Sequence, residues 1–490
     1  MRTQVFDMKR LGLYIVLALA AAGSTGCSKF LEKEPDNRAK LNSPEKVALL
    51  LATAYPKGSY IPFMELSTDN VNERSSGGTP NVTMDPYNFV DVRDNNEDSP
   101  EFYWNSCYTA IAAANEALEA IELAPEADKR KYSASKGEAL VARAYAHFML
   151  VNVFSKFYNE ASFANDPGIP YVTKPEKVVI EQYERGTVKE TYEKIEKDLL
   201  EGLPLLKDES YTVPQYHFTR NAAYAFAARF YLFQKKYDDV LYYTQQFIGA
   251  DVTTKLRPWN STYLTYTRLE LYANYQKATE PANLLLAETQ STWPRYVYSS
   301  RHSFDLTTVP LIQYVPIIGK RWSFLFQAYG NDQVYIPKIN EYFVRASVNA
   351  DYGDVYFMTP LFTMEEALFN RAEAMIYKGN YNGALDLINK YLSTRVYLYS
   401  ASTDVLTQQD IVDFFGNNKM QENLIELLLA YKQSEFVHEG LRWFDILRYD
   451  IPVTHYFVNG SRKTLEAGSN RRVFQIPQSA TLSGIELNPR

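Results

Sequence analysis

The sequence predicts a mainly α-helical fold that is interrupted by one irregular insertion rich in loops and short strands. Several long segments place apolar residues at steps of three and four, which is the period of an amphipathic helix. Residues 250–360 lack that period and are repeatedly broken by proline. Hydrophobic residues make up 46% of the 490-residue chain, which allows a large core and two or three domain-sized units.

The first residues have the features of an export signal. Three basic residues precede an apolar run at 11–22, which is too short to span a bilayer stably. Small residues then lead to Cys27, so we expect residues 1–26 to be a lipoprotein signal peptide and Cys27 to carry the lipid. Ser24 stands where such signals more often carry Leu, so an ordinary signal peptide or an apolar anchor is the alternative. Residues 27–40 are polar and charged and predict a flexible tether that holds the fold at a membrane.

Residues 41–249 predict a helical domain with one long loop region. Ser43 and Pro44 form a helix start, with Ser at the N-cap and Pro in the first turn. Residues 67–100 lose all periodicity and are rich in Gly, Pro, Asn and Asp, which predicts a surface loop of the kind that usually has a function. Apolar stripes then predict three helices, over residues 103–121, 140–151 and 188–206.

Two predicted helix pairs have similar sequences. The first covers residues 221–234 and 238–248, and the second covers residues 364–377 and 382–392. In the second pair, Gly379, Tyr381 and Ala384 follow the order G-x-Y-x-x-A, which resembles the inter-helix turn of a tetratricopeptide repeat. Glycine allows the tight turn, and alanine lets the second helix approach the first.

The first pair lacks that glycine and has Val240 in place of the alanine, so two unrelated helical hairpins are the alternative. We expect a tetratricopeptide-like helical-repeat scaffold. Its second part covers residues 361–450, and residues 451–490 form a C-terminal tail.

Charge and cysteine content limit the partners. The formal net charge is −7 and no basic face is evident, which argues against a nucleic-acid partner. If Cys27 carries lipid, Cys107 has no partner for an intrachain disulfide. Cys107 lies on the apolar stripe of residues 103–121, so we expect a buried small side chain rather than a reactive thiol.

Motif searches give little indication of catalysis or of a metal. The five histidines include no pair four residues apart, and no nucleophile-elbow, phosphate-loop or dinucleotide-binding motif is present. A glycosidase-type carboxylate pair stays open, because it has no sequence signature among 58 acidic residues. Residues 94–98 (DNNED) faintly resemble a calcium loop, but they lack its glycine and run into Pro100, so a solvated acidic loop is expected. We therefore expect no enzyme, no metal and no cofactor.

Aromatic side chains make residues 250–360 the best candidate ligand site. The chain contains 39 Tyr, 27 Phe and 5 Trp, and flat rings stack on the apolar faces of sugars while guanidinium groups bond their hydroxyls. The candidate residues in the insertion are Trp259, Tyr263, Tyr266, Trp293, Arg295, Tyr296, Tyr298, Arg301, Trp322 and Tyr329, and residues 67–100 add Tyr87 and Arg93. For each ring the alternative is a packing role, since a loop-rich region needs large side chains as its core.

The C-terminal part carries a recognisable pattern. Residues 435–450 (EFVHEGLRWFDILRYD) resemble the closing helix motif of the SusD/RagB family. Four further segments resemble other parts of that family in the same order: CSKFLEKEPDN, GEALVARAYAHFMLVNVF, RAEA with GNYNGAL, and FQIPQSATLSGIELNPR. The resemblance covers nearly the whole chain except residues 250–360. In the closing motif we expect Arg442, Asp445 and Arg448 to bond one another along one helix face, and Gly440 to relieve a helix contact.

The resemblance implies a lipid-anchored protein of the outer-membrane surface that binds glycans and delivers them, without catalysis, to a TonB-dependent transporter of SusC type. It implies that the tetratricopeptide-like half faces the transporter and that the irregular half carries the ligand site. Three alternatives stay open: a lid for a non-sugar nutrient such as peptide, a secreted glycoside hydrolase, and a scaffold that binds partners through its repeats.

Overall fold

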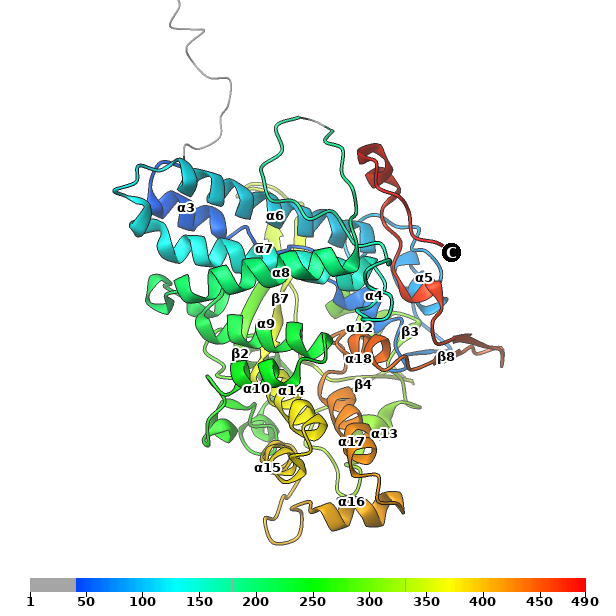
Figure 1. Ribbon diagram of the computed structural model, residues 1–490. Helices are drawn as coiled ribbons and strands as arrows, with labels where there is room; N and C mark the ends of the chain where they lie inside the picture. The colour runs from blue at the N-terminus through cyan, green and yellow to red at the C-terminus, as the bar shows by residue number, and fades with distance from the viewer. Residues whose placement is uncertain (1–40, 179, 331) are drawn as a thin grey trace, which may run out of the picture. The chain divides into compact units, whose positions relative to one another are not determined.

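Long helices packed side by side form the frame of the unit Ser43–Arg490 (Figure 1). The computed structural model describes residues 41–178, 180–330 and 332–490, apart from the side chain of Tyr329. The predicted signal peptide, the lipidation site Cys27 and the tether at 27–40 lie outside these residues. Within the described part of the chain, no helix has the length and apolar character needed to cross a membrane.

The helices are α3 (Pro44–Leu51), α4 (Ile61–Glu65), α5 (Asn81–Tyr87), α6 (Pro100–Leu123), α7 (Ser133–Phe154), α8 (Val188–Gly202), α9 (Arg220–Phe233), α10 (Tyr237–Thr244), α11 (Arg268–Tyr275), α12 (Trp293–Ser299), α13 (Val309–Gln313), α14 (Met364–Tyr377), α15 (Tyr381–Leu392), α16 (Gln408–Phe415), α17 (Met420–Glu435) and α18 (Arg442–Arg448). The strands are β1 (Asn72–Glu73), β2 (Asn283–Gln290), β3 (His302–Ser303), β4 (Gln327–Tyr329), β5 (Gln333–Tyr335), β6 (Tyr342–Arg345), β7 (Gly353–Thr363), β8 (Val453–Tyr456) and β9 (Arg462–Leu465).

The three helices predicted from apolar stripes are confirmed as α6, α7 and α8, which lie side by side in Figure 1. Their starts have ordinary caps: Ser99 accepts the Phe102 N–H at 3.1 Å before α6, and Thr187 forms a capping box before α8. The predicted start of α3 at Ser43 is confirmed in the same way. Because α7 lies between α6 and α8, it is buried over most of its length.

The two predicted helix pairs pack against each other, although the insertion separates them in sequence. They are confirmed as α9–α10 and α14–α15, and α14 contacts both α9 and α10. The Tyr237 and Tyr377 rings stack across this contact at 4.4 Å. Gly379 has a φ of +73° in the turn before α15, and Ala384 is fully buried, as the repeat pattern predicts. The fold is therefore a mainly α-helical, tetratricopeptide-like scaffold with a long insertion between two of its hairpins.

The insertion is more regular than its sequence predicts. β2, β7 and β6 form an antiparallel sheet in that order, and β7 runs directly into α14. The insertion is predicted to consist of loops and short strands, but residues 295–300 lie mostly in α12 and residues 311–318 begin in α13. The prediction is wrong for these two segments because periodicity cannot separate a short apolar helix from a strand. Residues 333–335 do form a strand, β5.

Residues 67–100 are not simply a surface loop. They contain α5, and Thr83, Asp85 and Tyr87 of that helix are buried. Backbone pairing of β1 with β3 attaches this region to the insertion. A segment without helical period can still be buried when its polar groups find partners in another part of the chain.

The closing motif is structural, but its contacts differ in part from those expected. Arg448 pairs with Asp445 at 3.0 Å as predicted, whereas Arg442 pairs with Asp69 at 2.8 Å. Gly440 lies in the turn between α17 and α18 with a φ of +72°, and a Cβ there would lie 3.2 Å from the Ile61 backbone. Ile61 is the first residue of α4, so Gly440 relieves a contact with a helix, as predicted, and it also accommodates the positive φ of the turn.

Cys107 is buried in α6 and free of a disulfide, as its place on the apolar stripe predicts. Burial raises the pKa of its thiol, which keeps it protonated and unreactive.

A buried charge network joins the insertion to the helical scaffold. The Arg257 guanidinium lies 2.8 Å from the carboxylate of Glu365 in α14, and Arg395 lies 2.7 Å from the same carboxylate. Arg395 also pairs with Glu435 of α17 at 3.0 Å. All four side chains are at most 1% exposed. Burial raises the pKa of Glu365, but the two guanidinium groups outweigh that effect and hold the pKa below its usual range.

Replacing Glu365 with Ala should leave two buried guanidinium groups without their shared counter-charge. We expect the free energy of unfolding to fall by roughly 3–5 kcal/mol, measured by denaturant titration at neutral pH. The matched control is Asp386→Ala, which breaks an exposed pair with Lys390 and should cost less than about 1 kcal/mol. Because the folded-state pKa of Glu365 is lowered, its contribution should be lost as the pH falls through that pKa. Equal losses in the two variants would contradict the structural role of the network.

Candidate functional site

The two regions predicted to carry the ligand site meet in the structure. Asn72 and Glu73 of β1 pair with Ser303 and His302 of β3. Next to this pairing, the Gly78 N–H donates to the Ser299 carbonyl at 3.0 Å. These backbone bonds fix residues 72–78 against the end of α12.

Two further features hold this junction. Gly77 has a φ of +115°, and a Cβ there would lie 2.6 Å from the Arg301 nitrogen, so the approach requires glycine. The Asp98 carboxylate accepts the Thr292 N–H at 2.9 Å and the Thr292 hydroxyl at 2.6 Å. Burial raises the pKa of Asp98 to about 6, and these bonds partly offset that effect.

Accessible tyrosine and charged side chains surround this junction. We call the set Arg268, Tyr272, Tyr298, Arg301 and Asp332 the junction surface; all five are exposed or half-buried. Its members are linked through neighbours. The Tyr335 hydroxyl lies 3.5 Å from both the Tyr272 hydroxyl and Arg268 Nη1, and the Tyr335 ring lies 5.6 Å from that of Tyr298.

Arg301 and Asp332 complete the junction surface through contacts with residues 72–78. Arg301 pairs with Glu73 at 3.0 Å while its side chain stays 31% exposed. Asp332 accepts the Ser75 hydroxyl at 2.8 Å, and that bond lowers the pKa of Asp332. The junction surface thus brings together tyrosine rings, guanidinium groups and a carboxylate.

Buried polar atoms next to the junction surface have no hydrogen-bond partner among the described residues. They are Arg74 Nε and Nη1, His302 Nδ1 and Gln333 Oε1. Burial lowers the pKa of Arg74 to about 10 and that of His302 to about 4, so at neutral pH Arg74 is charged and His302 is neutral. Buried polar groups normally find a partner, and such a concentration of unpaired ones is typical of a site that binds a polar ligand or water.

Arg74, Arg268, Tyr272 and Asp332 were not among the residues selected from sequence. The only sequence signal for Arg74 is its place beside the turn-prone run SSGG at 75–78, and Asp332 lies within an irregular segment.

The three candidate tryptophans are core residues. Trp259 and Trp293 are fully buried and Trp322 is 3% exposed. Trp259 packs between Tyr263 and Phe324, with ring centroids 5.1 Å apart in each case. Trp293 donates its indole N–H to the His438 carbonyl at 3.0 Å. The expectation that these rings face a ligand is corrected, because the insertion needs them to fill its core.

The remaining candidates divide between core and surface. Tyr87 is fully buried, donates to the Tyr456 carbonyl and stacks on His455 at 4.1 Å, and Tyr263 is 2% exposed. The expectation that these two rings face a ligand is corrected, because Tyr263 packs in the core of the insertion and Tyr87 packs against the C-terminal tail. Tyr266 is half-buried against Tyr263.

Arg93, Arg295 and Tyr296 remain accessible. Arg93 forms a bidentate pair with Asp85. Arg295 and Tyr296 are neighbours on α12, and Arg295 pairs with Glu341. Tyr329 lies in β4, and its side chain is outside the described set. A ligand role for the accessible residues stays a prediction.

Asp94 and Asp98 of the acidic run at 94–98 both accept hydrogen bonds from protein groups. Asp94 accepts the Asn96 N–H at 2.9 Å, and Asp98 turns into the β2–α12 connection. Across the described residues, no group of three or more His, Cys, Asp or Glu side chains is arranged to hold a metal ion.

Comparison with known proteins gives consistent results over most of the chain. Residues 29–232 match a family model described as SusD-like, starch-binding and associating with the outer membrane, and residues 331–481 match the model of the SusD family. A SusD-like protein of Formosa agariphila is 21% identical over 90% of this chain and 91% of its own length.

Solved structures share the fold. A SusD superfamily protein from Bacteroides thetaiotaomicron aligns with a TM-score of 0.68 at 19% identity, over 91% of this chain and all of its own. A laminarin-binding SusD-like protein aligns with a TM-score of 0.58 at 16% identity, over 91% of this chain and 99% of its own. These comparisons agree: two family models match in the expected order, one relative matches almost end to end, and the fold is shared. This chain therefore belongs to the SusD/RagB family.

Proposed function

We propose that this protein binds glycans at the junction surface and passes them to a TonB-dependent SusC-type transporter, without cleaving them. The observation that carries the proposal is the meeting of two irregular regions, 72–78 and 268–335, in one accessible set of tyrosine, arginine and aspartate side chains. Membership of a family whose model is described as starch-binding, and a laminarin-binding structural relative, support the sugar as ligand.

The side chains of the junction surface match the two faces of a sugar ring. Tyr272 and Tyr298 offer aromatic faces for the C–H side of a pyranose, and the buried Tyr335 contacts both. Arg301 and Asp332 provide a donor and an acceptor for hydroxyl groups, each already oriented by a partner at 3.0 Å or less. Oriented polar groups beside fixed rings lose little freedom when a ligand binds.

Delivery to a transporter requires that the protein stay at the membrane. The proposed lipid on Cys27 and the polar segment 27–40 provide that tether, and the family model is described as associating with the outer membrane. The tetratricopeptide-like helices are the proposed contact with the transporter, because stacked helical repeats present extended partner-binding surfaces.

Tyr298→Ala should weaken glycan binding without unfolding the protein. Aromatic stacking on nucleic-acid bases contributes about 1–3 kcal/mol, so a similar sugar contact predicts a loss of roughly tenfold or more in affinity. Isothermal titration with laminarin and malto-oligosaccharides measures it. The matched control is Tyr242→Ala on α10, an exposed tyrosine outside the junction surface, which should bind as the wild type does. Release of new reducing ends during titration, or binding of peptides and no glycan, would rule the proposal out.

Cys27→Ser should abolish lipid attachment. We expect the variant to leave the membrane fraction without detergent, while its glycan affinity in solution stays unchanged because the residues of the junction surface all belong to the unit Ser43–Arg490. Membrane fractionation and mass spectrometry of the N-terminus test this. A wild-type protein with an unmodified N-terminus would show that the anchor is wrongly assigned.

A further inference from the structure

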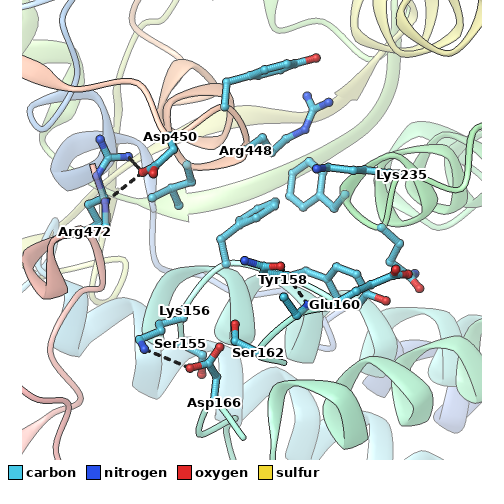
Figure 2. Close-up of a pocket in the computed structure, with 18 of the residues that line it drawn as sticks. Ser155, Lys156, Tyr158, Glu160, Ser162, Asp166, Lys235, Arg448, Asp450 and Arg472 are labelled. Carbon is cyan, nitrogen blue, oxygen red and sulfur yellow. Dashed lines mark hydrogen bonds and ion pairs between the residues drawn. The ribbon is translucent and has the colours of Figure 1, made fainter. Parts of the chain in front are cut away.

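A large pocket lies elsewhere in the fold and shares no lining residue with the junction surface. Its volume is about 800 Å³, within the usual range for small-molecule sites. Five segments line it: the chain after α7 at 155–166, the α9–α10 turn at 232–237, the end of α14, residues 447–450 at the end of α18, and residues 468–473. Figure 2 shows how the side chains of these segments surround the pocket.

The pocket has a buried polar floor with unused hydrogen-bonding capacity. Ser155 and Asp166 are only 4% and 6% exposed, yet Ser155 Oγ and Asp166 Oδ2 have no hydrogen-bond partner among the described residues. The other carboxylate oxygen of Asp166 lies 3.0 Å from Lys156 Nζ, as the dashed line in Figure 2 marks. In that view Ser155, Ser162 and Asp166 lie together at one end of the pocket. An unsatisfied buried carboxylate oxygen and hydroxyl favour a ligand that supplies O–H donors.

Aromatic side chains form much of the remaining wall. Phe157 and Phe233 contact each other with ring centroids 5.1 Å apart, and the stacked pair of Tyr237 and Tyr377 lies beside them. Rings beside a buried acceptor are suited to a ligand with one apolar face and several hydroxyls.

Charge pairing in the pocket favours a neutral ligand. Lys156 pairs with Asp166, Arg472 pairs with Asp450 at 3.2 Å, and Arg448 pairs with Asp445 at 3.0 Å. Lys236 pairs with Glu196 at 3.3 Å, which leaves Lys235 as the lining cation for which no ion pair is seen among the described residues. An anion would have to compete with these carboxylates, whereas a neutral polyol leaves every pair intact.

We propose that this pocket is a second saccharide site that binds one neutral sugar unit, with Asp166 Oδ2 and Ser155 Oγ bonding its hydroxyls and Phe157 or Phe233 covering its apolar face. The inference goes beyond the proposed function, because it rests on the chemistry of the pocket and is independent of the junction surface.

The full-length protein in detergent is titrated with methyl glucoside, methyl galactoside and methyl mannoside and followed by saturation-transfer NMR. We expect at least one of them to bind, and Asp166→Asn and Ser155→Ala each to weaken that binding, the former by about tenfold. Ala161→Trp, at an exposed lining position, should fill the pocket and abolish binding without touching the floor.

Tyr298→Ala separates the two sites. It should leave binding at the pocket unchanged while it weakens oligosaccharide binding at the junction surface, so failure of one site is distinguishable from failure of the other. The pocket proposal is overturned if none of the three glycosides binds, or if Asp166→Asn and Ala161→Trp bind them as the wild type does.

Discussion

The architecture depends on a set of charges buried where the insertion meets the helical scaffold. Arg395 bridges Glu365 of α14 and Glu435 of α17, and Arg257 of the insertion shares the Glu365 carboxylate. Taking such charges out of water is expensive, so they are stable only when every member is in place. The network therefore specifies one position of the insertion on the scaffold, which apolar packing alone specifies less strictly.

The same principle extends toward the junction surface. Lys338, which follows β5, is fully buried and lies 2.8 Å from Glu439, and Tyr275 at the end of α11 donates to the same carboxylate at 2.6 Å. The accessible residues Tyr272 and Tyr298 thus stand on elements whose ends are fixed by buried polar contacts. A binding surface built from loops can be rigid when its supporting layer is satisfied in this way. The core tryptophans Trp259, Trp293 and Trp322 contribute to that support and do not form the surface itself.

Much of the scaffold was predictable because its signals are local. The stripe of residues 103–121 and the G-x-Y-x-x-A turn at 379–384 each specify a structure within a few residues, and both are confirmed. β2 and β7 were not predicted, since each is stabilised mainly by its partner some seventy residues away along the chain. The junction surface was predictable only as a region: the sequence pointed to 67–100 and 250–360 and to Tyr298 and Arg301, but it could not separate accessible rings from core rings.

The sequence by itself determined the helical period, the cap at Ser43, the expected export signal and the family motifs, because these depend on neighbours a few residues apart. Tertiary structure decided which residues are accessible. Trp259 and Tyr298 belong to the same aromatic-rich segment, yet one is buried against Phe324 and the other reaches the surface beside residues 72–78. Whether a side chain is buried depends on contacts between segments that are distant in sequence, and the composition of one segment does not predict those contacts.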